Sequence, residues 1–119
     1  MNDRRQIVGG RGEQLAAAFL QARGFRLVEA NWRCPLGEID LIMERGGQFR
    51  FIEVKTRFTQ TYGYPEESIT KTKLRHLAHA IELWLRTQNP PPEDYQADAV
   101  AILVLPDKEP EIEWIEGIL

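Results

Sequence analysis

The stretch from residue 37 to residue 57 constrains the fold most strongly, because it reads as two strands joined by a two-residue turn. Gly46 and Gly47 separate two segments rich in β-branched and aromatic residues, and a Gly-Gly pair supplies the positive φ angles that a type I′ turn requires. Such a turn fixes the register of the hairpin and makes one of its faces apolar. The expected pairs are Arg45 with Gln48, Leu41 with Ile52, and Ile39 with Val54.

The other face of this hairpin carries charged residues. In the same register Asp40 lies opposite Glu53, and Lys55 projects on that face two residues further along. Opposed residues have Cβ atoms about 4.5 to 5.5 Å apart, and like charges at that distance repel each other unless a cation lies between them. Mg²⁺ and Mn²⁺ take hard oxygen ligands, commonly one or two carboxylates with water and phosphate. The pattern therefore predicts a divalent-metal site.

Length and composition fit one globular domain spanning residues 1–119. No apolar run approaches the roughly 18 residues of a membrane span, and the amino terminus leads into no signal-peptide pattern. We therefore expect a cytoplasmic protein with no membrane partner. Cys34 is the only cysteine, so an internal disulfide is excluded.

Charge is unevenly distributed along the chain, although the net charge is only −3. Residues 45–86 carry +4 and residues 87–119 carry −7. A polyanion could meet the basic part while the acidic end stays away from it. An unevenly charged but merely solvated surface explains the same pattern, and the sequence leaves both interpretations open.

The chain follows the order helix, three strands, helix, strands, which indicates an α/β fold. The helix at 13–23 is expected to bury Leu15, Phe19 and Ala22. The expected segments are a mobile arm at 1–12, a helix at 13–23, a strand at 25–30, a connection at 31–36, the hairpin, a loop at 58–68 that could act as a flap, a helix at 69–87, a central strand at 99–105 and an edge strand at 111–115.

The helix at 69–87 has an apolar stripe and a basic side. Lys71, Arg75 and His79 recur every four residues, with Lys73 and His76 nearby. Such a line can follow the phosphates of a nucleic acid, although a solvated helix face is an equal alternative. Histidines on the polar side of a helix are more often surface residues than catalytic ones.

The order of elements, with Asp40 followed by Glu53-Val54-Lys55, resembles the PD-(D/E)XK nuclease superfamily. That resemblance implies the restriction-endonuclease-like fold, which has an αβββαβ core and a mixed central sheet flanked by helices. A closer resemblance, over almost the whole chain, is to the YraN-like family of uncharacterised proteins. It rests on Gly12-Glu13, Asn31-Trp32-Arg33, Gly37-Glu38-Ile39-Asp40, Glu53-Val54-Lys55-Thr56-Arg57, Gly63, a lysine within 69–73, and Asp98. One position departs from the pattern, because Gln96 stands where the family commonly has arginine, which puts the role of that segment in doubt.

Within the superfamily the chain is most similar to archaeal Holliday-junction resolvases. That resemblance implies that Asp40, Glu53 and Glu13 bind Mg²⁺ or Mn²⁺ and that Lys55 orients or polarises the attacking water. The implied activity is metal-dependent hydrolysis of phosphodiester bonds by an endodeoxyribonuclease, with DNA, including branched DNA, as the partner; a homodimer is left open. The expected DNA contacts are Arg11, Arg57, Lys71, Lys73 and Arg75. Two rival interpretations stay open, a catalytically silent DNA-binding or protein-interaction module and a metal-stabilised structural protein.

Overall fold

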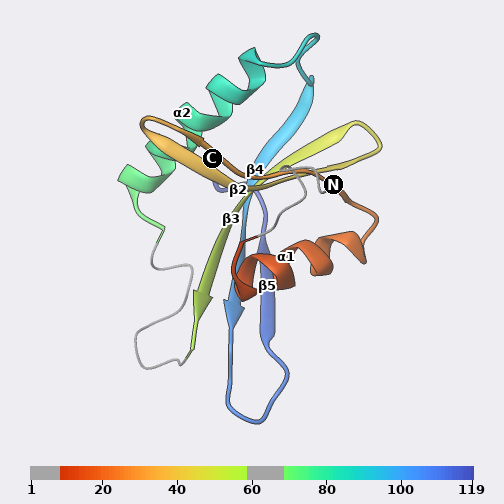
Figure 1. Ribbon diagram of the computed structural model, residues 1–119, viewed down its shortest axis with the longest axis vertical. Coiled ribbons are helices and arrows are strands. Elements are labelled where there is room, and N and C mark those ends of the chain that lie inside the picture. Colours follow the sequence, from red (N-terminus) through yellow and green to blue (C-terminus); the bar gives the residue numbers. More distant parts are fainter. Residues whose placement is uncertain (1–8, 59–68) are drawn as a thin grey trace.

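The structure is a computed structural model that describes residues 9–58 and 69–119 (Figure 1). Residues 1–8 of the expected arm, and residues 59–68 with Gly63 and most of the expected flap, lie outside the described residues. The elements in chain order are α1 (Arg11–Gln21), β1 (Arg26–Cys34), β2 (Gly37–Arg45), β3 (Gln48–Arg57), α2 (Lys71–Arg86), β4 (Asp94–Leu103) and β5 (Glu111–Ile115). The expected αβββαβ order is confirmed.

The strands form one mixed sheet in the order β1-β2-β3-β4-β5. All neighbours are antiparallel except β3 and β4, which run parallel. A parallel neighbour needs a crossover connection, and the segment that contains α2 supplies it. β5 lies at the edge of the sheet, as its alternating acidic pattern predicts.

The hairpin formed by β2 and β3 has the predicted turn. Gly46 and Gly47 have φ angles of +57° and +86°, which an L side chain rarely adopts. Arg45 pairs with Gln48 and Leu41 pairs with Ile52, so the register is confirmed from the turn as far as Leu41.

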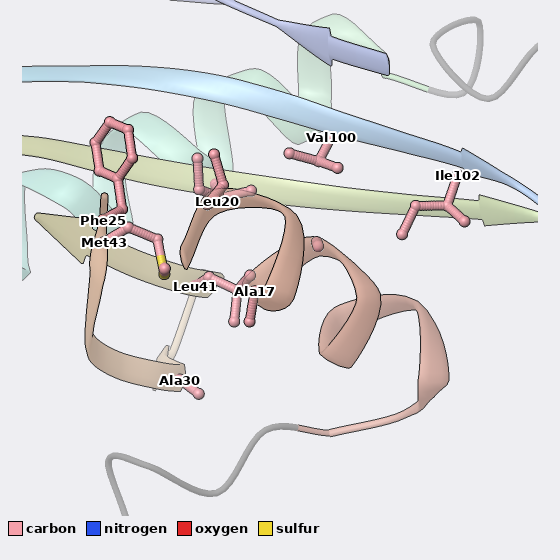
Figure 2. Close-up of a cluster of buried hydrophobic side chains, with 10 residues drawn as sticks. Ala17, Leu20, Phe25, Ala30, Leu41, Met43, Val100 and Ile102 are labelled. Carbon is pink, nitrogen blue, oxygen red and sulfur yellow. The ribbon is translucent and has the colours of Figure 1, made fainter. Parts of the chain in front are cut away.

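Each face of the sheet is covered by one helix, and each helix closes its own apolar cluster. On one face Ala16, Ala17 and Leu20 of α1 pack against alternating residues of the strands, as Figure 2 shows for Leu41 and Val100. On the other face α2 packs Leu77, Ala80, Ile81 and Trp84 against Ile39, Ile42, Phe51 and Ala97. Burial on both faces explains why β4 reads as a continuous apolar run.

Three expected element boundaries and part of one expected buried face were wrong. Helix α1 begins at Arg11, so residues 11 and 12 are helical and do not belong to a mobile arm. Its fully buried residues are Ala16, Ala17 and Leu20, whereas Leu15 and Phe19 of the predicted stripe are only partly buried against the same cluster and Ala22 is exposed. Strand β1 runs to Cys34 because β2 pairs with it along that length, and β4 begins at Asp94 because it pairs there with Gln48 of β3. Pairing with a distant strand leaves no local signal in the sequence.

Candidate active site in the fork between β2 and β3

The two strands of the central hairpin diverge before they reach the charged residues. Their pairing ends at Leu41 and Ile52, so Asp40 and Glu53 are not a directly opposed pair, contrary to the predicted register. In Figure 1 the β1–β2 turn lies beside α2 at the left of the view, while β3 and β4 continue downward. The divergence opens a fork whose walls are β2, β3 and α2.

Asp40 lies where the side-chain alternation of β2 breaks. Leu41 packs in the cluster on the α1 face, and in a regular strand Ile39 would do the same, yet Ile39 packs on the α2 face. Across from this break, Asn31 of β1 has a φ of +54°, a left-handed conformation that few residues other than glycine adopt. The backbone is therefore turned at Asp40, and its Oδ2 accepts a hydrogen bond of 2.8 Å from the Val54 N–H.

The carboxyl group of Asp40 is strongly perturbed. Only 8% of the residue is exposed, and this burial is the largest cause that raises its pKa to about 7. The negative charge of Glu53 is the next cause in the same direction, and Glu13 and Glu38 add to it; the Val54 N–H acts in the opposite direction. Near neutral pH the site therefore resists holding the negative charge of Asp40 unless a cation is present.

Lys55 and Glu53 project into the same fork from β3. The Lys55 Nζ atom lies 3.1 Å from Glu53 Oε1, and both side chains are mostly buried. Burial acts to lower the pKa of Lys55, but its contacts with Lys73 and Glu53 and the charges of Glu53 and Asp40 raise that pKa on balance. Lys73 enters from α2, and its contact with the Lys55 amino group lowers its own pKa. Three elements thus bring charged groups to one place.

Two glycines allow both helices to approach this place closely. A side chain at Gly12 would overlap the Thr56 hydroxyl, so this glycine lets the first turn of α1, which carries Glu13, lie against β3. A Cβ atom at Gly37 would lie 2.5 Å from the backbone oxygen of His76, so Gly37 lets the start of β2 lie against α2. The motifs that contain these glycines therefore have a packing explanation as well as a chemical one.

A pocket of about 260 Å³ occupies the fork. Its lining residues are Gly37 and Glu38 of β2, Glu53 and Lys55 of β3, and Lys73, His76 and Leu77 of α2. The sequence did not assign Glu38 to the site. His76 is exposed, as the sequence predicts for a surface residue, but it also lines the pocket. The signal for Glu38 was present in its place two residues before Asp40, whereas nothing in the sequence places His76 against β2.

The carboxylates fit a magnesium or manganese site only if water and phosphate supply the remaining ligands of the ion. Within residues 9–58 and 69–119, no three His, Cys, Asp or Glu side chains converge closely enough to hold a metal ion. Asp40 and Glu53 interact more strongly with each other than Asp40 does with Glu13. Glu13 Oε1 is buried with no hydrogen-bond partner among the described residues. Mg²⁺ commonly takes one or two carboxylates and completes its shell with water and phosphate, so Asp40 and Glu53 suit it as ligands with Glu13 alongside.

The residues expected to contact DNA do not all lie together. Lys73 lines the pocket, and the charge of Arg57 is close enough to contribute to the lowered pKa of Lys73. Lys71 and Arg75 are exposed on the first turns of α2 outside the pocket lining. Arg11 is exposed at the start of α1, which covers the other face of the sheet.

Asp98 lies outside this site and has a structural role. It is fully buried and accepts hydrogen bonds from Gln96 Nε2, Trp114 Nε1 and the Gly117 N–H, each 2.9 Å long, and Arg50 Nε lies 3.8 Å away. The glutamine that departs from the family pattern therefore serves as a hydrogen-bond donor to Asp98. This network ties β5 and the residues after it to β4.

The fold and the site together define a mixed α/β protein with a carboxylate and lysine pocket where two strands of its sheet diverge. Among the described helices, none is long and apolar enough to cross a membrane. The chain belongs to the Uncharacterised protein family UPF0102, whose profile matches residues 12–102.

Relatives in this family match the chain over almost its full length. A UPF0102 protein of Renibacterium salmoninarum is 45% identical over 93% of this chain and 94% of its own. One from Nocardia farcinica is 38% identical over 96% of this chain and 90% of its own. One from Geobacter sulfurreducens is 38% identical over 92% of this chain and 86% of its own. The expected YraN-like resemblance is confirmed at the level of this family.

Proposed function

We propose that this protein is a divalent-metal-dependent endonuclease that hydrolyses phosphodiester bonds in DNA, with branched DNA such as four-way junctions as the first substrate class to test. The observation that carries the proposal is the state of Asp40. Its carboxyl group is buried beside Glu53 with its pKa raised to about 7, while Lys55 lies 3.1 Å from Glu53 in the same fork. A buried carboxyl group with a perturbed pKa, close to a second carboxylate and a lysine, is typical of catalytic sites.

The proposed roles follow from the positions of the side chains. Asp40 and Glu53 would hold Mg²⁺ or Mn²⁺, and a bound ion supplies a water of lowered pKa and offsets the charge of the reacting phosphate. Lys55 donates a hydrogen bond that orients the attacking water and stabilises negative charge on the phosphate. Hydrolysis forms a bond from the water oxygen to phosphorus and breaks one ester bond; the leaving oxygen keeps the electron pair and takes up a proton. Glu13 extends the acidic side of the site from α1.

The test is cleavage of linear, nicked, flapped and four-way DNA by the purified protein with Mg²⁺ or Mn²⁺. We expect cleavage by the wild type and a loss of at least about 100-fold in Asp40→Asn and in Lys55→Ala, because each removes a group that acts on the reacting phosphate or water. DNA affinity in Ca²⁺ should change little in Lys55→Ala, since its proposed role is in the chemical step. Asp94→Asn, an exposed acid at the start of β4, is the matched control for Asp40→Asn.

Two outcomes would contradict the proposal. DNA binding without cleavage of any substrate would instead indicate a DNA-binding module on this fold. Cleavage that survives in Asp40→Asn would indicate that the fork is not the catalytic centre.

A further inference from the structure

Three cationic side chains converge at the α2 side of the fork. Lys55 comes from β3, Lys73 from the first turn of α2, and Arg57 from the end of β3. Lys55 and Lys73 line the same pocket, and Arg57 lies two residues beyond Lys55 on the same side of β3. In agreement with this placement, the contact with Lys55 and the charge of Arg57 lower the pKa of Lys73, while the charge of Glu53 acts in the opposite direction. Positive groups so arranged repel each other unless an anion lies between them, in the same way that the carboxylates repel each other without a cation.

The carboxylates of the pocket do not cancel this positive charge. Glu38 lines the pocket but also forms an ion pair with Arg33, at 3.2 Å. Glu53 is paired with Lys55 at 3.1 Å. Within residues 9–58 and 69–119, Lys73 and Arg57 form no ion pair, so their charges can act on a ligand. His76 adds a ring nitrogen that can form a hydrogen bond on the same wall of the pocket.

We propose that Lys73, Arg57 and Lys55 form a subsite for a phosphate monoester dianion, the terminal phosphate of a DNA strand. The inference rests on the proposed function in one respect, because hydrolysis of a phosphodiester is what generates such a strand end at this place. A phosphodiester carries one negative charge and a terminal phosphate close to two at neutral pH. Lys73 and Arg57, with the Lys55 amino group beside them, therefore bind the cleaved strand end more tightly than the uncleaved strand.

The closing experiment titrates the metal-free protein, in EDTA at pH 8, with inorganic phosphate and separately with dimethyl phosphate, and follows binding by calorimetry. No cleavage occurs under these conditions. Inorganic phosphate should bind at least fivefold more tightly than dimethyl phosphate. Lys73→Gln and Arg57→Gln should each weaken phosphate binding at least fivefold, Lys73→Arg should restore it, and Arg86→Gln, which removes the same charge from the far end of α2, should leave it unchanged.

A second arm identifies the source of the phosphate. Short oligonucleotides that end in a phosphate should bind more tightly than the same sequences ending in a hydroxyl, and Lys73→Gln should abolish the difference. Equal binding of both oligonucleotides beside tight binding of inorganic phosphate would assign the subsite to a free phosphate and overturn the strand-end assignment.

The subsite proposal and the nuclease proposal can fail separately. Equal weakening by Lys73→Gln and Arg86→Gln would attribute phosphate binding to overall charge and overturn the subsite, even in a protein that cleaves DNA. Specific phosphate binding in a protein that cleaves no DNA would uphold the subsite and overturn the nuclease.

Discussion

Asp40 shows how one residue can make a stable protein sensitive to its ionic surroundings. The residue is 8% exposed, and its carboxyl group lies close to Glu53 and accepts a hydrogen bond from the Val54 N–H. A carboxyl group in such a place is more easily protonated or bound to a cation than left negatively charged. A proton and a divalent cation would therefore compete for this carboxyl group.

The first prediction concerns the pH dependence of stability in EDTA. The pKa of Asp40 is 3.8 in the unfolded chain and about 7 in the folded protein, so the folded state binds the extra proton. The contribution of Asp40 protonation to the free energy of unfolding is fully present below about pH 3.8 and is lost as the pH rises through about 7. The loss amounts to about 4 kcal/mol at most. Urea unfolding of the wild type and Asp40→Asn between pH 4 and 8 measures it as the difference between the two curves. Parallel curves would contradict the prediction.

The second prediction concerns metal binding. At pH 8, Mg²⁺ or Mn²⁺ should raise the thermal midpoint of the wild type. A metal concentration of 100 times Kd should raise its free energy of unfolding by about 2.7 kcal/mol. The rise should shrink at pH 6, because protons then occupy Asp40. Asp40→Asn should show no rise, while Asp94→Asn should behave as the wild type. Because the neutral amide can itself stabilise the metal-free protein, each variant is compared with its own value in EDTA. Equal rises in Asp40→Asn and the wild type would place the metal elsewhere.

At the scale of elements, the site depends on how closely the helices approach the sheet. Gly37 sets the distance between β2 and α2, and Gly12 sets that between α1 and β3. Residues on three separate elements, Glu38, Lys55 and Lys73, line one pocket only because these distances are short. Gly12 and Gly37 therefore influence the positions of the charged groups, although neither glycine has a side chain that could take part in the chemistry.

The third prediction tests this dependence at Gly37. Gly37→Ala adds a Cβ atom 2.5 Å from the His76 backbone oxygen. This clash can be relieved only if helix α2 shifts away from β2, because the oxygen belongs to the helix backbone. We expect a loss of about 1 to 3 kcal/mol in urea unfolding, as for overpacking elsewhere, together with a weaker metal response. Gly10→Ala, where nothing lies within 4 Å of the added atom, should cost less and keep the metal response. Equal effects of the two substitutions would refute the close-packing argument.

The fourth prediction separates Asp98 from the candidate active site. Removing its carboxylate in Asp98→Ala leaves Arg50 buried without its partner, which should cost about 3 to 5 kcal/mol. Asp98→Asn, which keeps an acceptor oxygen, should cost less. Asp94→Ala, at an exposed position, should stay within about 0.5 kcal/mol of the wild type. Urea unfolding measures all three. Each Asp98 variant that remains folded should still show the rise in thermal midpoint with Mg²⁺ or Mn²⁺. A folded variant without that rise would assign Asp98 to the candidate site.

The hairpin was predictable from the sequence because both its turn and its register are local properties. Gly46 and Gly47 specify the turn, and strand alternation then follows. The break at Asp40 was not predictable, because it lies opposite a left-handed residue, Asn31, in another strand, and pairing between strands leaves no local signal. The place of His76 was equally hidden, since a helical pattern gives the face of a residue but not the strand that it meets. The sequence could therefore identify Asp40 and Lys55 as candidates without giving their geometry.

On the scale of the whole molecule, the charge segregation along the chain is also a segregation in space. Helix α2, with exposed Lys71 and Arg75, packs mainly against β2 and β1. Strand β5, with exposed Glu111 and Glu113, forms the edge of the sheet furthest from β1. A polyanion bound at the fork would therefore extend along α2 and away from β5, because the basic side chains of α2 attract it and the acidic side chains of β5 repel it.

The fifth prediction places DNA along the first turns of α2. Phosphate contacts release counterions, so log K falls with log salt by about 0.9 for each phosphate neutralised on duplex DNA. Replacing Lys71 and Arg75 together by Gln should reduce that slope by roughly two units, because both side chains are exposed beside the fork. Replacing Glu111 and Glu113 by Gln should leave the slope nearly unchanged and raise only the association rate.

The measurement uses the Asp40→Ala protein, so that binding is observed without turnover, on duplex and four-way DNA from low to physiological salt. A reduced slope on both substrates would show that α2 follows the backbone of any duplex arm. A reduced slope on the junction alone would show that α2 contacts an arm that exists only in branched DNA, which would favour branched DNA as the substrate. An unchanged slope on both would mean that Lys71 and Arg75 form a solvated helix face, and the DNA path would then have to leave the fork in another direction.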